Sequence, residues 1–125
     1  MAGTEVLTPS VAATLDVMAA EIELAGARCI FLDKVIGEVM DRLSEADREQ
    51  MLQGLHAVDL LSQHLTSLSA FARGMSVAVP AELAAPVGDA LSEITLGALA
   101  ERIVAGLGGG DGGCEPADAG DLDLF

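Results

Sequence analysis

The sequence predicts an all-α protein built on a long antiparallel helical hairpin. Ala and Leu outnumber the β-branched residues Val, Ile and Thr, which favours helix over sheet. Apolar residues recur at alternating spacings of four and three from Val11 to Leu43, as in a heptad seam. A second apolar stripe of helical period runs from Met51 to Met75. Two long amphipathic helices of similar length, joined by a short link, form a hairpin.

The first helix is expected to begin at Pro9. Thr8 precedes it as a candidate N-cap, and proline suits the first helical position because its missing N–H has no partner there. The seam expected to face the partner helix comprises Val11, Leu15, Met18, Ile22, Ala25, Cys29, Leu32, Ile36, Val39 and Leu43. A seam of this length predicts one arm of an elongated bundle.

The second helix is expected to run from about Glu45 to Met75. Ser44 is a suitable N-cap, since its hydroxyl can accept a hydrogen bond from the first turn. Glu45 and Asp47 put negative charge on that turn, where the helix dipole favours it.

The remaining chain predicts a third, shorter helix and a tail. Pro80 and Pro86 mark a connection, and residues 88–106 have helical periodicity. We expect a helical hairpin or bundle domain over residues 1–106 and a flexible linker rich in glycine and acid over 107–119. Residues 120–125 are expected to form a peptide that binds a partner, so that a disordered acidic tail ends the chain.

The hairpin is expected to need a further neighbour. Residues 29–36 are apolar on more than one side of the first helix, and two helices alone cannot bury both seams. The neighbour could be the third helix or another copy of the chain, and both remain open here. A homodimer with a four-helix-bundle core is our expectation.

Composition excludes several kinds of partner. The 125 residues carry a formal net charge of −14, which repels nucleic-acid phosphates and anionic lipid surfaces. Apolar residues make up 51% of the chain, yet no run approaches the roughly 18–20 residues that cross a bilayer. Without a signal-like start, and with Cys29 and Cys114 in settings that suggest free thiols, a cytoplasmic protein is expected.

The candidate site is the pair Asp59 and Gln63 on the second helix. A spacing of four places both side chains on one side of the helix, away from the apolar stripe. His56, Thr66 and Ser67 are expected to share that side. The plain alternative is an ordinary solvent-facing helix surface, and periodicity alone does not decide between the two.

The segment Asp59-Leu60-Leu61-Ser62-Gln63 resembles the DxxxQ signature of the CheZ family of chemotaxis phosphatases, which includes short CheT-type relatives. The hairpin layout, the linker and the final residues "GDLDLF" are also similar to that family. The resemblance implies a dimeric four-helix bundle that acts on a phosphorylated CheY-type response regulator.

The resemblance also implies roles for particular residues. Gln63 would orient the water that attacks the aspartyl phosphate, and Asp59 would pair with the active-site lysine of the receiver domain. The tail would bind the same regulator through Asp121, Leu122, Asp123, Leu124 and Phe125. No cofactor is expected from this chain, because receiver domains carry their own Mg²⁺.

Two other functions remain possible from the sequence. The same scaffold could serve as a non-catalytic adaptor that binds a response regulator or another chemotaxis protein, such as the receptor methyltransferase. His56 and His64 also allow a phosphotransfer domain, although Arg73 is the nearest following cation to His64. Neither histidine has a second ligand at metal-binding spacing on its side of the helix, so no metal site is expected.

Overall fold

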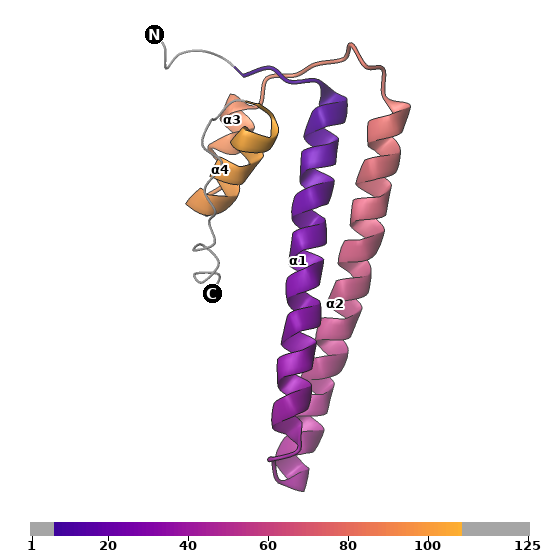
Figure 1. Ribbon diagram of the computed structural model, residues 1–125, viewed down its shortest axis with the longest axis vertical. Coiled ribbons are helices and arrows are strands. Elements are labelled where there is room, and N and C mark those ends of the chain that lie inside the picture. Colours follow the sequence, from indigo (N-terminus) through magenta and orange to yellow (C-terminus); the bar gives the residue numbers. More distant parts are fainter. Residues whose placement is uncertain (1–6, 109–125) are drawn as a thin grey trace. The chain divides into compact units, whose positions relative to one another are not determined.

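The computed structural model describes residues 7–108. Within that range it contains four helices and no strand, which confirms the all-α prediction (Figure 1). The two long helices, α1 (Val11–Met40) and α2 (Glu45–Ala78), pack against each other as the antiparallel hairpin. Two short helices follow, α3 (Gly88–Leu91) and α4 (Gly97–Gly106).

The beginning of α2 agrees with the prediction. The Ser44 hydroxyl accepts a hydrogen bond from the Asp47 N–H at 3.2 Å, so Ser44 is the N-cap. The helix starts at Glu45 as expected and continues three residues beyond Met75, to Ala78. The preceding turn is tight, because the Leu43 N–H donates to the Met40 carbonyl at 3.1 Å.

The predicted beginning of α1 is wrong by two residues. Ser10 is the N-cap, since its hydroxyl accepts a hydrogen bond from the Ala13 N–H at 3.0 Å. Pro9 lies before the helix, and its carbonyl accepts the Ala85 N–H at 3.2 Å. Thr8 cannot cap α1, because the chain around it is extended and bonds to a segment more than 70 residues later.

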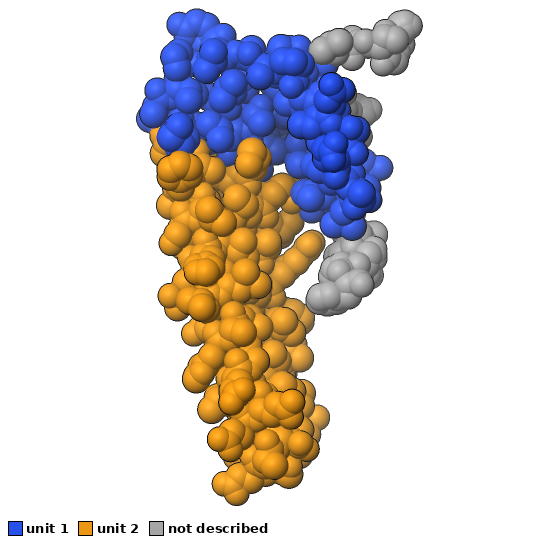
Figure 2. Space-filling view, turned by 180° about the vertical axis from the view of Figure 1, so that it is seen from behind, with its two compact units in different colours: residues 1–17, 75–125 blue, residues 18–74 orange. Residues whose placement is uncertain are grey.

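The chain divides into two compact units, which Figure 2 shows in different colours. Residues 18–74 form the hairpin unit, and residues 1–17 with 75–125 form the other.

In the hairpin unit, the buried residues of α1 and α2 have small side chains. Ala19 on α1 is fully buried, and Gly26 on α1 and Ser69 and Ala72 on α2 are buried. A methyl group placed on Gly26 would lie 3.8 Å from the Leu65 Cβ. The two helix backbones therefore approach each other closely at Gly26.

Only part of the expected α1 seam is turned away from α2, since its members Ile22, Cys29 and Ile36 are half-buried in line with Ala19 and Gly26. Met18 and Leu32 belong to that seam, yet both are exposed. One position after Met18, Ala19 is fully buried. The reason is steric, because small residues permit a closer backbone approach than the bulky seam residues beside them.

The other unit joins the residues before α1 to the connection that follows α2. The Val11 N–H donates to the Leu83 carbonyl at 2.8 Å, and the Val87 N–H donates to the Leu7 carbonyl at 3.1 Å. An isolated antiparallel bridge joins Ser10 and Ala84. Side-chain packing also contributes, since Val87 is buried.

The predicted third helix over 88–106 is two helices. The Ser92 hydroxyl donates to the Asp89 carbonyl at 2.6 Å, and the Ile94 N–H bonds to Leu91 three residues back, which tightens and ends α3. Ile94 and Thr95 are β-branched and disfavour helix. The later helix, α4, packs within its own protomer, because a Cβ on Gly106 would meet a Val17 methyl at 3.0 Å.

Candidate functional site

The structure places the predicted site residues on one exposed side of α2. Asp59 and Gln63 are both exposed, and so is His56 one turn before them. Thr66 and Ser67 are exposed one turn after Gln63. At about 100° per residue, these five positions span an arc of roughly 100° around the helix. The structure thus brings together the five α2 residues that the sequence singled out.

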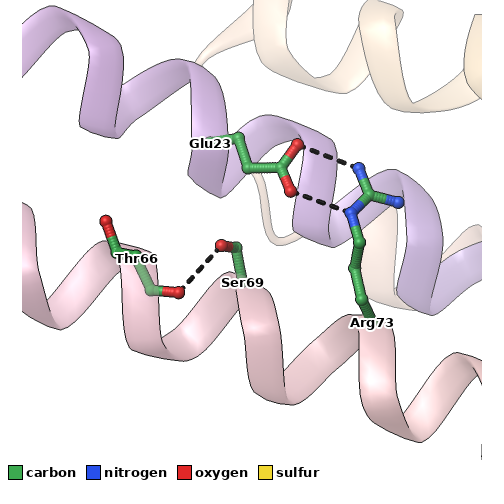
Figure 3. A network of polar contacts seen from close by, with 4 residues as sticks. All are labelled: Glu23, Thr66, Ser69 and Arg73. Carbon is green, nitrogen blue, oxygen red and sulfur yellow. Dashed lines mark hydrogen bonds and ion pairs between the residues drawn. The ribbon is translucent and has the colours of Figure 1, made fainter.

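The two central side chains are free to meet a partner. No hydrogen bond to the side chain of Asp59 or Gln63 is found within residues 7–108. A carboxylate and a carboxamide one turn apart can accept and donate hydrogen bonds at one surface. The local backbone is held by α2 itself, with the Ser69 hydroxyl bonded to the Thr66 carbonyl at 3.0 Å (Figure 3).

An ion pair joins α1 and α2 on the same side of the hairpin. Arg73 donates through Nε to Glu23 Oε2 at 2.8 Å and through Nη2 to Glu23 Oε1 at 2.9 Å (Figure 3). The hydrogen bond from Arg73 lowers the pKa of Glu23 below its usual value. Desolvation opposes this effect, and the positive charge of Arg73 adds a lesser lowering. Asp59, Thr66 and Arg73 lie seven residues apart, so all three share this side of α2.

The ion pair sets the alignment of the two helices next to the site. Steps of seven residues in opposite directions from Glu23 and Arg73 bring Ile30 opposite Thr66 and Gly37 opposite Asp59. Ile30 is exposed, and nothing lies within 4 Å of a Cβ built on Gly37. The surface opposite Asp59 therefore has no side chain at position 37, and no other described atom fills the space there.

Asp121, Leu122, Asp123, Leu124 and Phe125, the predicted partner-binding tail, lie outside the described residues, as do Cys114 and most of the predicted linker. Cys29 is a free, half-buried thiol.

Residues 7–108 contain no cluster of three or more His, Cys, Asp or Glu side chains arranged to hold a metal ion. None of the helices in that range is both long enough and apolar enough to span a bilayer.

Sequence reasoning missed three residues that shape the site: Glu23, Arg73 and Gly37. Glu23 and Arg73 are 50 positions apart, and their pairing depends on an alignment that no local pattern specifies. Gly37 could have been noticed as a glycine inside a helix, which costs stability unless it has a packing or functional reason.

Comparison with known proteins identifies a family but no characterised relative. No curated protein and no solved structure matches the chain. Residues 7–125 match a family described as a domain of unknown function, DUF8776. This match covers both long helices, both short helices and the tail. The chain is therefore a member of the DUF8776 family.

Proposed function

We propose that this protein binds a phosphorylated CheY-type response regulator and promotes hydrolysis of its aspartyl phosphate. The observation that carries the proposal is the pair of exposed side chains, Asp59 and Gln63, one turn apart and without a hydrogen-bond partner in the described chain. Their resemblance to the DxxxQ signature supplies the chemistry. A rigid helix, rather than a loop, holds both residues.

In the proposed reaction, a water oxygen attacks the phosphorus of the receiver's aspartyl phosphate. The bond between phosphorus and the aspartyl oxygen breaks, the carboxylate leaves, and inorganic phosphate forms. Gln63 accepts a hydrogen bond from the water and donates one to a neighbouring oxygen, which holds the water in line. Asp59 pairs with the receiver's lysine and sets the depth of docking. The Mg²⁺ ion belongs to the receiver, and this chain contributes no cofactor.

Access to the site supports the proposal. The surface opposite Asp59 is formed at Gly37, which has no side chain. A receiver loop that carries the phosphorylated aspartate can approach a low surface more closely than one crowded by long side chains. The tail residues 120–125 are proposed as a second contact that raises the effective concentration of the regulator.

The test is phosphate release from a CheY-type receiver domain loaded with acetyl phosphate, with and without this protein. We expect faster release with the unmutated chain and a loss of about 10²-fold or more with Gln63→Ala. Gln53→Ala is the matched control, because Gln53 is an exposed glutamine on the same helix, outside the site. Equal release with Gln63→Ala and the unmutated protein would exclude a catalytic role for Gln63.

One observation favours the adaptor as the second candidate. No hydrogen bond from another described residue holds the Gln63 amide, so its orientation before docking is set by the helix alone. A water-positioning group works best when its surroundings fix it in advance. A non-catalytic adaptor needs only the exposed surface, and it would bind a response regulator or the receptor methyltransferase without a change in phosphate lifetime. Binding measured together with phosphate release separates the two functions.

A further inference from the structure

Three exposed residues form a row on the outer side of α1. Leu24 is 36% exposed and Phe31 is 62% exposed, and Arg28 between them is exposed as well. Spacings of four and three residues place the three side chains within about 60° of one another around the helix. Gly26, where an added Cβ would contact Leu65 of α2, lies about 140–160° away from each of them. We call Leu24, Arg28 and Phe31 the outer row.

The arginine of the outer row has no acid beside it. No hydrogen bond or ion pair to the Arg28 guanidinium is found among residues 7–108. The positions three and four residues before and after it on α1 are all uncharged. The nearest acid on that side of α1, Glu21, is seven residues earlier, about 10 Å along the helix axis. The outer row therefore presents a positive charge flanked by two apolar side chains.

The last helix meets α1 in line with the outer row. Val17, Leu24 and Phe31 follow one another at intervals of seven residues, so they lie along the same side of α1. A Cβ on Gly106, the last residue of α4, would lie 3.0 Å from a Val17 methyl group. The chain that follows α4 therefore starts beside Val17, one heptad before Leu24.

The composition of residues 109–125 complements the outer row. This segment contains five acids and no Lys or Arg. All of its Leu and Phe residues fall in the sequence DLDLF of residues 121–125, within two positions of an aspartate. An aspartate carboxylate can pair with a guanidinium while the neighbouring apolar side chains cover other apolar groups. The outer row has the same two kinds of group with the charge reversed.

We propose that residues 121–125 dock on the outer row of their own chain. An aspartate of this segment pairs with Arg28, and its Leu and Phe side chains cover Leu24 and Phe31. The inference rests on the exposed surface of α1 and on the sequence of the segment, and not on the proposed function.

The length of the chain permits this contact. Asp121 lies thirteen positions after Gly108, and thirteen residues span at most about 45 Å. From Val17 to Phe31, α1 extends only about 21 Å. A short tether also gives an effective concentration on the order of millimolar, so a contact too weak to form between separate molecules can be occupied within one chain.

The exposed apolar side chains of α2 fit the segment less well. Leu60, Leu68 and Phe71 are 54%, 52% and 67% exposed. However, α2 has no Lys or Arg between Arg48 and Arg73, and Arg73 is paired with Glu23. An aspartate held on that surface would lose water without meeting a cation. The cation of the outer row is what favours α1.

The first test measures backbone order parameters of residues 121–125 by ¹⁵N relaxation in the unmutated chain. We expect values above about 0.6, because a docked segment moves with α1, whereas lower values mark a flexible segment. Values below about 0.6 at all five residues would overturn the proposal. This measurement needs no variant and therefore does not depend on how a variant folds.

The second test locates the contact. Phe31→Ala removes the largest apolar side chain of the outer row and should lower the order parameters of residues 121–125 below about 0.6. Phe71→Ala is the matched control, because Phe71 is a similarly exposed phenylalanine on α2, and it should leave the values unchanged. Equal values in the two variants would place the segment elsewhere and overturn the assignment.

The third test concerns the charge. Arg28→Gln removes the positive charge and should also lower the order parameters of residues 121–125. Lys34→Gln is its control, because Lys34 is an exposed cation of α1 that pairs with Glu38 and points about 120° away from Arg28. The same order parameters in both variants would contradict the pairing with Arg28.

Dilution distinguishes docking within one chain from docking on a second copy. A contact within one chain gives order parameters that stay constant when the protein is diluted about tenfold, because its occupancy does not depend on protein concentration. Values that fall on dilution would show that the segment binds another copy, and they would overturn the proposal.

The proposed contact has a consequence for the tail. A segment held on α1 is not available to another protein. Any partner that binds residues 121–125 must therefore displace them from the outer row.

Discussion

Glu23 of α1 and Arg73 of α2 form a bidentate ion pair, although 50 residues separate them in sequence. The planar guanidinium matches the planar carboxylate only when both helices lie in one longitudinal alignment. The pair therefore marks the alignment that puts Gly37 opposite Asp59. Both side chains are about half exposed, so solvent screens the pair, and its main contribution is to select this alignment rather than to add much stability.

The first prediction concerns the pH dependence of this pair. The pKa of Glu23 is lower in the folded protein than its reference value of 4.5, mainly because Arg73 donates hydrogen bonds to it. A lowered carboxyl pKa gives stability that is present above the unfolded-state pKa and is lost as pH falls through the folded-state pKa. We expect Glu23→Gln to lower the urea midpoint slightly at about pH 7, and this difference to shrink at an acid pH below the folded-state pKa of Glu23.

Glu38→Gln is the control for that measurement. Glu38 pairs with Lys34 within α1 at 3.7 Å, and both side chains are well exposed. Removal of this pair should change the urea midpoint less than Glu23→Gln does, because it joins no second helix. A Glu23→Gln effect of the same size at both pH values would show that lost packing, and not charge, causes it.

The second prediction concerns the close approach at Gly26. Its Cβ would lie 3.8 Å from the Leu65 Cβ, an ordinary contact, so Gly26→Ala should fit and raise the free energy of unfolding by about 0.5–1 kcal/mol. Gly26→Leu should instead force the helices apart and cost about 1–3 kcal/mol. Gly37→Leu is the matched control, because open space surrounds that position. Thermal unfolding of the three variants measures these differences.

Much of the hairpin could be predicted because local signals agree along it. Ser44, the acids that follow it and the apolar period together specify where α2 begins, and the structure agrees. The beginning of α1 could not be predicted in the same way. Thr8 and Ser10 are both plausible caps, and hydrogen bonds to the distant residues Leu83 and Ala85 decide for Ser10.

The sequence also did not predict which face of α1 packs against α2. A heptad pattern shows which residues of a helix are apolar. It does not show which of two adjacent rows of apolar residues packs against the neighbouring helix. Ala19 and Gly26 contribute little to an apolar count, yet they are the buried residues of α1. The bulky residues beside them, Met18 and Leu32, stay exposed. The exposed side of Asp59 and Gln63 was predictable, because it needed only the helical period.

The third prediction concerns Asp33, which lies seven residues after Gly26 on α1. One carboxyl oxygen, Oδ1, is buried and has no hydrogen-bond partner among the described residues. A buried unsatisfied polar atom costs about 1–3 kcal/mol, so Asp33→Leu should raise the free energy of unfolding by an amount in that range. Asp41→Leu, at an exposed position after α1, should have little effect. A lower unfolding midpoint for Asp33→Leu would mean that the carboxylate makes a stabilising contact.

The fourth prediction tests whether a partner docks over Gly37. A leucine at position 37 would fill the open space opposite Asp59 without a clash inside the hairpin. If a receiver domain docks there, Gly37→Leu should weaken its binding at least about 10-fold, since a single misplaced side chain disturbs close packing at the contact. Gly37→Ala adds only one methyl group and should weaken binding less.

The variants Gly37→Ala and Gly37→Leu also distinguish an effect on protein stability from an effect on receiver binding. Replacing glycine in a helix favours the folded state by up to about 1 kcal/mol, so neither Gly37→Ala nor Gly37→Leu should unfold the protein. A loss of binding in Gly37→Leu with an unchanged or raised thermal midpoint is therefore a local steric effect. Equal receiver affinity for Gly37→Leu and the unmutated chain, measured by titration calorimetry, would move the docking surface away from the side that carries Asp59 and Gln63.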